Sequence, residues 1–433
     1  MCRSIFKYIF LFSFGFLFSF IFFYVMQPIY CDEVWVYGFS YNISKGMIIY
    51  RDFNVLQMPL YFFIASLFIK IFGNYIIVIH IFDSLLFATM LIMLSKIIHW
   101  KVLILLPIFI FWWPSGYNLL CLFFLILIIY LINQKKDCDY LIAFLIGLCF
   151  ITKQNIGLCL LLPCLFYSKN KIKTILIFII PFLVLSIYMI YYDAFYNFID
   201  YCFLGMFEFG EKNLNYSIFW LLFVILNILF LLLMLFRSKF RDKEIFYILI
   251  FQLITYPIFD IRHVICSFFP VMYLILKKIS SRYICFLIAF FVYSLYFSLF
   301  ISVNYSINFD KNILYLRNSR QLDILIDGVV DYVGENENFF FVDYYSYLIK
   351  LYSDIPISQY DLLLSGNVGY KGMEKKLKQL DELCLVEKCY FFSEYYPKDD
   401  IVGSQYQYFH QYIVSNYQKV DSLFEFDIYT NVN

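Results

Sequence analysis

The run YIFLFSFGFLFSFIFFYVMQPIYCDE, residues 8–33, decides the class of fold, because an apolar stretch long enough to span a bilayer ends at two adjacent carboxylates, Asp32 and Glu33. The stretch is too long for the core of a signal peptide, and no small-residue cleavage site follows it. It therefore predicts a retained membrane helix. Arg3 and Lys7 precede the helix, and basic residues favour the cytoplasmic side. We expect the amino terminus inside and Asp32 outside.

The composition extends this interpretation to most of the chain. Of the 433 residues, 63% are hydrophobic and only 15% are charged, and the mean hydropathy is +0.76. These values exclude an ordinary soluble domain and predict a polytopic α-helical membrane protein. The heavy use of Phe, Ile, Tyr, Asn and Lys is typical of an AT-rich genome, so we expect a bacterial inner membrane as the location. A nucleic-acid partner is not expected.

The charges divide the chain into two parts. Residues 303–433 hold 19 of the 32 acidic residues and 11 of the 33 basic ones, which leaves 13 acidic and 22 basic residues in 1–302. We therefore predict a membrane domain over 1–302, with an external loop at 31–73 that carries the acidic pair. An acidic, soluble domain over 303–433 follows it.

Further apolar segments predict the other membrane helices. They lie near residues 75–98, 102–113, 119–132, 140–152, 156–168, 174–192, 218–236, 245–259, 264–277 and 283–302. The segment 59–73 either crosses the membrane or lies along its outer surface as a short amphipathic element. If it does not cross, there are eleven spans, and 16 of the 22 Lys and Arg residues of 1–302 lie inside. Crossing reverses this bias, so the positive-inside rule favours the non-crossing arrangement and an external carboxyl-terminal domain.

This topology gathers the polar interruptions of the apolar pattern on the external side. They are CDE at 31–33, YRDF at 50–53, QMPLY at 57–61, TKQN at 152–155 and FDIRH at 259–263. An external carboxylate pair beside cations at the lipid boundary suits a reaction between an anionic, lipid-borne substrate and a neutral nucleophile. The cations would hold the phosphate, and a carboxylate would take the proton.

Most of these groups also have a purely structural interpretation. Asp32 and Glu33 are consistent with a solvated helix end, and Arg262 and His263 with side chains that reach toward the interface from the end of a span. Lys153 is harder to explain in this way. An ammonium group inside an apolar stretch is costly unless it lines a wet cavity or pairs with an anion, so we favour a functional role for Lys153.

The order of these motifs resembles the GT-C superfamily of membrane glycosyltransferases, and within it the bacterial clan related to protein O-mannosyltransferases and aminoarabinose transferases of lipid A. The resemblance covers residues 1–302: an apolar helix, DE, YRDF, MPLYFFIASLFIKIFG, a helix interrupted by TKQ, and YPIFDIRH. Its most specific portion is 28–73. The resemblance implies inverting transfer of a sugar from a polyprenyl-phosphate donor to a hydroxyl of a lipid, glycan or protein acceptor on the external face.

The resemblance also implies roles for individual residues. Asp32 corresponds to the catalytic carboxylate, and Glu33 orients the acceptor or, in some branches, helps Asp32 to hold a divalent metal such as Mg²⁺ or Mn²⁺. No other cofactor is implied. The groups expected near the donor phosphate are Arg51, Lys153, Arg262 and His263, and those expected to contact the substrates are Asp52, Tyr61, Gln154 and His80.

One departure from the family pattern concerns His80. The clan often has an arginine at the start of the helix that follows the turn at 71–73, whereas this chain offers His80, which puts one phosphate contact in doubt. His80 and Asp83 lie three residues apart on one helix face, where they can satisfy each other. For Asp83 we favour this structural role.

The acidic tail predicts a small α/β domain. Strands are expected at 338–343, 389–394 and 423–430, with a short helix after the first strand and further helices at 371–386 and 405–417. The tail carries no nucleotide-binding glycine fingerprint and no metal-ligand cluster, so we expect it to shape the acceptor entrance, to contact a partner or to serve a structural role. Cys384 and Cys389 flank a helix-to-strand turn, where they either pair or lie too far apart to do so.

Three other classes of protein stay open. A lipid-linked sugar polymerase or ligase would typically carry a large polar loop between later spans, whereas here the large extramembrane piece is terminal. A transporter or flippase of lipid-linked saccharides predicts polar residues at midplane depth and often repeated halves, and the sequence shows no internal repeat. An inactive relative that serves as a scaffold predicts that Asp32→Asn has no phenotype.

Overall fold

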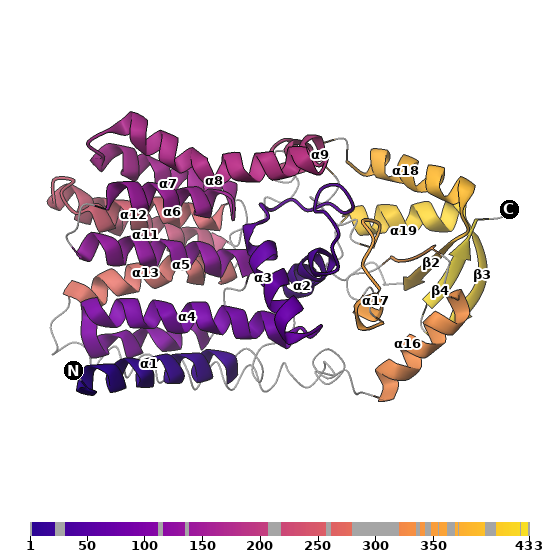
Figure 1. The fold of residues 1–433 in the computed structure, drawn as a ribbon, viewed down its shortest axis with the longest axis horizontal. Coiled ribbons are helices and arrows are strands. Elements are labelled where there is room, and N and C mark those ends of the chain that lie inside the picture. The colour runs from indigo at the N-terminus through magenta and orange to yellow at the C-terminus, as the bar shows by residue number, and fades with distance from the viewer. Residues whose placement is uncertain are drawn as a thin grey trace.

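A computed structural model of the protein describes two parts, a helical bundle and a small sheet with its own helices (Figure 1). The described residues are 2–21, 31–110, 116–134, 138–206, 218–256, 261–278, 320–334, 338–342, 348–353, 355–361, 369–370, 372–394, 404–424 and 426–431. A mostly helical chain with a small carboxyl-terminal α/β region is therefore confirmed. The predicted boundary at 302/303 lies outside the described residues.

The helices of the bundle follow one another with short connections. In chain order they are α1 (Cys2–Ile21), α2 (Cys31–Ser44), α3 (Leu60–Phe72), α4 (Ile77–Ile98), η2 (His99–Ile110), α5 (Gly116–Asn133), α6 (Asp139–Phe150), α7 (Gln154–Tyr167), α8 (Lys171–Tyr191), α9 (Phe195–Ile199), η3 (Asp200–Leu204), α11 (Ile218–Arg237), α12 (Lys243–Phe251), η4 (Gln252–Thr255) and α13 (Ile261–Lys278).

Four stretches of helix are long and apolar enough to cross a membrane among the residues that the structure describes: Ile77–Leu106, Gly116–Asn133, Lys171–Tyr191 and Ile218–Arg237. The last of these, α11, leaves many of its large apolar side chains exposed, for example Phe219, Leu226 and Phe236. Exposed apolar surface on this scale is typical of contact with lipid. The pattern is that of a multi-pass membrane protein. The count of eleven spans stays a prediction, and its last segment, 283–302, lies outside the described part of the chain.

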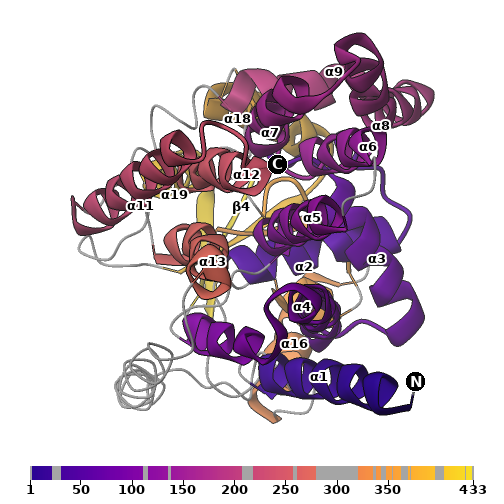
Figure 2. The ribbon, with the colours of Figure 1, turned by 90° about the vertical axis from the view of Figure 1, so that its left-hand side faces the viewer.

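The first of these stretches changes direction at His99, which has a φ of 55°. After this turn, η2 packs beside α4 and α13 (Figure 2). The Lys101 ammonium at the start of η2 donates to the carbonyl oxygen of Leu276, near the end of α13, at 3.2 Å. The two predicted segments 75–98 and 102–113 thus correspond to two helices within one apolar run.

Helix α5 lies at the centre of the bundle, in contact with α3, α4, α6, α12 and α13 (Figure 2). Nearly every side chain from Leu119 to Ile129 is buried, because the helix is apolar on all sides. Its neighbour α6 packs closely against α7. Gly157 of α7 permits this approach, since a Cβ at that position would overlap the backbone of Phe150.

The two ends of the bundle differ in chemistry. At the end where α4 and α5 finish, the ammonium of Lys96 lies 5.4 Å from the ring of Tyr130, and Lys277 donates to Asn133 Oδ1 at 2.9 Å and to Glu244 Oε1 at 2.6 Å. We call this the basic end. The opposite end, where α4, α5, α7 and α13 begin, is the polar end.

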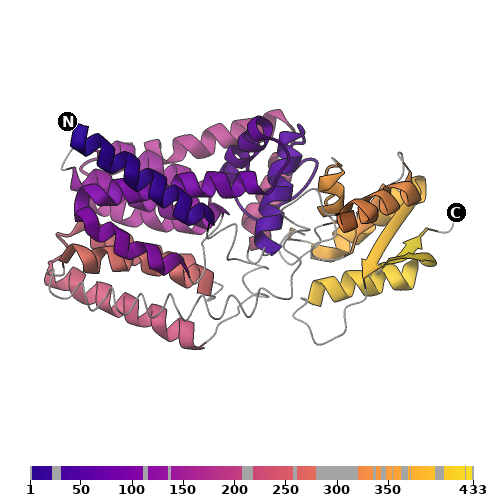
Figure 3. The same cartoon turned by 90° about the horizontal axis from the view of Figure 1, so that it is seen from below.

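Helix α3 has both of its ends at the polar end of the bundle. The amide of Leu60 donates to the carbonyl oxygen of Ile151, in the turn between α6 and α7, at 3.1 Å. Just after the last turn of α3, Asn74 accepts a hydrogen bond from the hydroxyl of Tyr37 in α2. Helices α2 and α3 therefore lie between the bundle and the carboxyl-terminal domain (Figures 1 and 3). That 59–73 does not cross a membrane stays a prediction.

The carboxyl-terminal domain is a four-stranded mixed sheet between two layers of helix (Figure 1). Strand order is β1-β2-β4-β3, with β1 parallel to β2 and the other pairs antiparallel. Its elements are α16 (Arg320–Val333), β1 (Asn338–Phe341), α17 (Leu348–Tyr352), α18 (Gly372–Val386), β2 (Cys389–Glu394), α19 (Ser404–Asn416), β3 (Gln418–Leu423) and β4 (Phe426–Thr430).

Both faces of the sheet are buried at β1 and β2, which explains the continuous apolar runs of these two strands. Phe340 and Phe391 pack in a cluster with α18 and α19, whereas Phe339 and Phe392 belong to the cluster that includes α16. Strands covered on both faces read as unbroken apolar sequence instead of alternating. The predicted strands that begin at 338 and 389 are confirmed, as are the helices at 371–386 and 405–417.

Two elements of this domain differ from the sequence prediction. The strand predicted at 423–430 is confirmed over Phe426–Thr430, which is β4, but its start is wrong: β3 ends at Leu423, and Phe424 turns the chain with a φ of 55°. The edge strand β3, QKVDSL, is almost fully exposed and so lacks an apolar pattern. Helix α16 was also not predicted. Of the two alternatives for Cys384 and Cys389, the structure has the disulfide, with Cα atoms 5.6 Å apart.

The carboxyl-terminal domain docks on the polar end of the bundle through side-chain amides. The Asn42 side chain donates from Nδ2 to the carbonyl oxygen of Ile357 at 2.8 Å and accepts at Oδ1 from the amide of the same residue at 3.0 Å. Asn74 donates to the carbonyl oxygen of Leu351 at 2.8 Å. These bonds satisfy backbone groups that docking removes from water.

A buried lysine lies in the same interface. Lys376 of α18 is 3% exposed, and its ammonium donates to Gln359 Oε1 at 2.6 Å and lies 5.2 Å from the ring centre of Tyr201 in η3. Asn54 of the bundle donates to the same Gln359 oxygen at 3.0 Å. The bundle and the domain therefore share this acceptor.

Burial, together with the smaller effect of the neighbouring Lys375, lowers the pKa of Lys376 from its usual 10.5 to about 7, while Asp200 acts in the opposite direction. Between these two pH values the unfolded chain binds a proton at Lys376 that the folded protein does not. The folded protein is then stabilised as the pH rises from about 7 towards 10.5, and this contribution is absent below about 7.

We expect the pH dependence of stability to change in Lys376→Met, which removes the titrating group at similar length. The free energy of unfolding of the wild type should increase relative to that of the variant as the pH rises from 7 to 10. Thermal unfolding of the purified protein measures this difference. Lys376→Arg is the matched variant. It keeps its charge over this range, so it should be less stable than the wild type and should also lack the gain. A difference between the wild type and Lys376→Met that does not vary with pH would contradict this assignment.

Candidate functional site

Lys153 occupies the turn between α6 and α7 at the polar end. Helix α6 ends at Phe150, and the amide of Lys153 still donates to the carbonyl oxygen of Cys149 at 2.9 Å. Lys153 itself has an extended backbone and is the residue that precedes the first turn of α7. The polar run TKQN therefore lies at the turn that separates two short apolar helices.

Asn118 connects Lys153 to His263. The Lys153 ammonium donates to Asn118 Oδ1 at 2.9 Å, and Asn118 Nδ2 lies 3.4 Å from His263 Nε2. The same ammonium is 3.5 Å from the carbonyl oxygen of Ile254 and 5.6 Å from the ring centre of Tyr117. We call Lys153, Asn118 and His263 the polar cluster. It joins the first turns of α5, α7 and α13, which are distant in the sequence.

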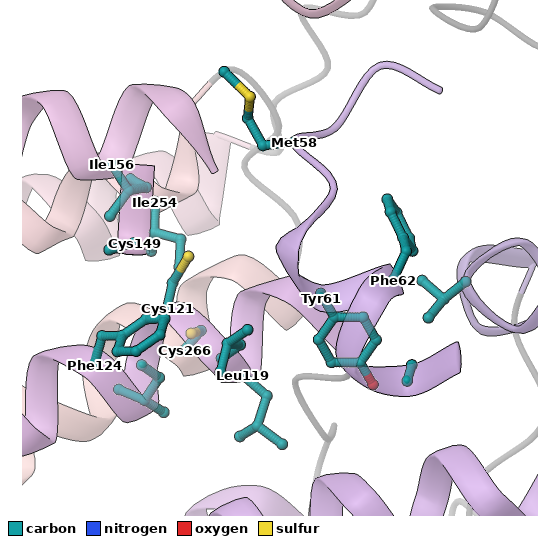
Figure 4. Close-up of a cluster of buried hydrophobic side chains, with 14 of the residues drawn as sticks. Met58, Tyr61, Phe62, Leu119, Cys121, Phe124, Cys149, Ile156, Ile254 and Cys266 are labelled. Carbon is teal, nitrogen blue, oxygen red and sulfur yellow. The ribbon is translucent and has the colours of Figure 1, made fainter. Parts of the chain in front are cut away.

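Buried apolar side chains of the same part of the bundle lie close to the polar cluster. Figure 4 shows Leu119 and Cys121 of α5 near Ile156 of α7, Ile254 of η4 and Cys266 of α13. Each of these five side chains is fully buried. The cluster therefore borders a dry core, where hydrogen bonds and charges interact more strongly than in water.

A buried carboxylate fixes the start of α5. Asp83 of α4 is 0% exposed and accepts from the hydroxyl of Tyr61 at 2.7 Å and from the amide of Gly116 at 3.1 Å. Gly116 has a φ of 63°, a conformation that glycine adopts without strain. A negative charge is favourable at a helix amino terminus. Asp83 therefore determines where α5 begins, two residues before Asn118.

Three residues predicted for the site have side chains outside the described part of the structure. The backbones of Asp32 and Glu33 lie in the first turn of α2, and that of Arg262 lies in the first turn of α13. Both helices begin at the polar end (Figure 1). Their proposed roles stay predictions.

The structure pairs Arg51 with Asp52. The Arg51 guanidinium donates to the two Asp52 carboxylate oxygens at 2.7 and 3.0 Å, and Asp52 also accepts from the amide of Ile48 at 2.6 Å. The YRDF motif thus forms a turn with Tyr50 and Phe53 buried and the charged pair at the surface. No described hydrogen bond or ion pair links Arg51 to the polar cluster.

The other predicted residues lie in the core of the polar end. Gln154 is largely buried and donates to the carbonyl oxygen of Cys202 at 2.7 Å. Tyr61 is fully buried with its hydroxyl on Asp83, and His80 is 1% exposed within α4. In the structure Gln154 and Tyr61 hold neighbouring elements together. Their predicted contact with substrates stays a prediction.

Among the residues that the structure describes, no group of three or more His, Cys, Asp and Glu side chains is placed to hold a metal ion. The ligands that the sequence suggests, Asp32 and Glu33, have side chains outside this set. No chemical step is therefore assigned to a metal.

Sequence reasoning did not single out Asn118. In the sequence it is a lone asparagine in GYNLLCLFF, with no neighbouring charge to mark it. The available signal is that Asn118 is the last polar residue before a long apolar run, at the end of the helix where Lys153 is also expected. For Asp83 the sequence suggests His80 as partner, which stays a prediction; the partners that the structure gives are the hydroxyl of Tyr61 and the amide of Gly116.

The fold and the polar end define a helical protein of the multi-pass membrane class with a small α/β domain docked on one end of its bundle. Comparison of the chain with protein-family models, with curated proteins and with solved structures gives no match in any of the three.

We expect Asp83→Ala to destabilise the protein, because it removes a charged acceptor from the amide of Gly116 and the hydroxyl of Tyr61. The free energy of unfolding should fall by about 2–4 kcal/mol, measured by thermal unfolding in detergent. Asp139→Ala is the control, since Asp139 lies at the basic end in a pair with Lys243 at 3.8 Å and should contribute less than about 1 kcal/mol. An Asp83→Ala variant as stable as Asp139→Ala would show that the carboxylate does not anchor α5.

Proposed function

We propose that the protein is a membrane glycosyltransferase that moves a sugar from a polyprenyl-phosphate donor to an acceptor hydroxyl on the extracytoplasmic face, with inversion. The observation that carries the proposal is the position of Lys153. Asn118 holds its ammonium at 2.9 Å at the polar end of an apolar bundle, and α2 begins at the same end with Asp32 and Glu33. A cation at the lipid boundary is suited to a lipid-borne phosphate.

Two observations support an extracytoplasmic location of the polar end. The carboxyl-terminal domain that docks on it contains the disulfide between Cys384 and Cys389, and disulfides persist mainly in oxidising compartments. Lys96, Lys101 and Lys277 gather at the opposite end of the bundle. An excess of lysine and arginine marks the cytoplasmic side of membrane proteins.

The chemistry assigned to these groups is a single displacement. The bond between the anomeric carbon and the phosphate oxygen breaks, and Lys153 offsets the charge that grows on the departing phosphate. The acceptor hydroxyl attacks the opposite face of the sugar and forms the new carbon–oxygen bond, while Asp32 takes the hydroxyl proton. Attack opposite the leaving group gives inversion. His263 lies beside Lys153 through Asn118 and belongs to the donor side in this scheme.

We expect wild-type membranes to transfer sugar from at least one member of a panel of radiolabelled polyprenyl-phosphate sugars. Transfer should fall by about 10²-fold or more in Asp32→Asn, which removes the base, and by about 10²-fold in Lys153→Ala, which removes the cation. Lys96→Ala, at the basic end, is the matched control at equal expression and should stay within about twofold of the wild type.

The alternatives predict other results in the same assay. Absence of transfer with every donor, together with unchanged cell-surface glycans after deletion of the protein, would favour a scaffold. Movement of lipid-linked saccharide across reconstituted vesicles without transfer would favour a flippase. Full transfer by Asp32→Asn would leave the class of enzyme intact but would exclude Asp32 as the base.

We expect the carboxyl-terminal domain to be labelled from outside the cell only after reduction. Because both cysteines are buried, the cells are treated with a mild denaturant. A membrane-impermeant maleimide should then modify Cys384 and Cys389 in intact cells that also receive a reductant and should leave both unmodified without the reductant, as measured by mass spectrometry. Cys138 is the internal control, because it is a free thiol at the start of α6, near the basic end, and should react only in broken cells. Labelling of Cys138 in intact cells would contradict this orientation.

A further inference from the structure

The Asn118 amide makes two contacts that need opposite chemical groups. An ammonium has only donors, so the atom that faces Lys153 at 2.9 Å is the oxygen Oδ1. The amide nitrogen must then face His263 Nε2, at 3.4 Å. A ring nitrogen that accepts from an amide carries no proton, so the His263 tautomer that fits this contact has its proton on Nδ1. One side chain therefore determines the placement of the cation and the tautomer of the histidine.

The backbone that carries Asn118 is itself held in place. Asp83 binds the amide of Gly116 at 3.1 Å, and the sulfur of Cys266 in α13 lies 3.7 Å from the carbonyl oxygen of Asn118. Most side chains of α5 from Leu119 to Ile129 are also buried. Asn118 thus has little freedom to adjust, and the ammonium is oriented before any ligand arrives. Such prior orientation reduces the cost of reorganisation when charge develops.

We propose that Asn118 is a positioning residue for a lipid phosphate: it orients the Lys153 ammonium and the His263 ring toward the phosphate group. This inference rests on the proposed function for the identity of the ligand. It assigns no contact between Asn118 and the sugar, and it concerns a residue that the motifs do not mark.

The same helix offers a matched comparison at its other end. Asn133 Oδ1 accepts from the ammonium of Lys277 at 2.9 Å, as Asn118 does from Lys153, but Lys277 also pairs with Glu244 at 2.6 Å. Substitutions at Asn133 thus change an equivalent amide–ammonium contact on the same helix, far from the polar cluster.

The experiment measures binding of two photoreactive probes by the purified full-length protein in lipid nanodiscs. One probe is a polyprenyl phosphate, and the other is the uncharged polyprenol of the same length. We expect Asn118→Asp to weaken binding of the phosphate probe by about tenfold or more, because a carboxylate of the same size pairs with Lys153 and opposes the phosphate. Asn118→Ala should weaken it by about threefold to tenfold. Binding of polyprenol should not change in either variant, nor should binding of either probe change in Asn133→Ala and Asn133→Asp.

Three outcomes would overturn the inference. Wild-type affinity for the phosphate probe in Asn118→Asp would show that Asn118 does not act through Lys153. Equal loss of phosphate and polyprenol binding would show a merely structural role. If the wild type binds the polyprenyl phosphate no better than the polyprenol, the protein has no phosphate site. Specific binding of the phosphate without transfer of any sugar in membranes would instead refute the proposed function and leave the role of Asn118 intact.

Discussion

The carboxylate of Asp83 is the constraint on which the geometry of the polar end depends. A fully buried charge is tolerated only where hydrogen bonds surround it, and Asp83 receives them from Tyr61 of α3 and from the start of α5. These bonds fix three helices relative to one another at one point. Because α5 is the central helix and contacts α6, α12 and α13, its position also constrains the positions of these helices. Lys153 and His263 are positioned in the same way.

Lipid imposes a second constraint, which separates the polar groups along the length of α5. Asn118 and Asn133 stand fifteen residues apart on this helix, which corresponds to about 22 Å, and each contacts a lysine from another part of the chain. Between them the helix has apolar side chains except for one tyrosine. The bundle therefore concentrates its ionic chemistry at its two ends and leaves α11 and α8 to meet the hydrocarbon. The two ends are alike in construction but differ in charge, since a described carboxylate, Glu244, pairs with the lysine at the basic end.

Much of this arrangement could be predicted from the sequence, because apolar length and periodicity mark helices and buried strands. The hypothesis of a functional role for Lys153 also comes from sequence alone, since a charge inside an apolar run is conspicuous. Contacts between distant segments could not be predicted. Asn118 has no local signal in the sequence. Arg51 was expected near a phosphate, and in the structure its guanidinium pairs with the neighbouring Asp52. Strand β3 was not predicted because its side chains are exposed at the edge of the sheet, so its sequence has no apolar pattern.

The docking of the carboxyl-terminal domain has a consequence for how the chain can change. Asn42 and Asn74 bind the domain through the peptide groups of Ile357 and Leu351, not through side chains that are particular to those residues. Because peptide groups are the same at every position, these hydrogen bonds depend on the backbone path of the docked segment and not on its amino-acid sequence. At Ile357 and Leu351 the domain side of the joint is thus free to diversify, whereas Gln359, which accepts from Asn54 through its side chain, is not. A domain with a different outer surface could be carried on the same bundle without redesign of the joint.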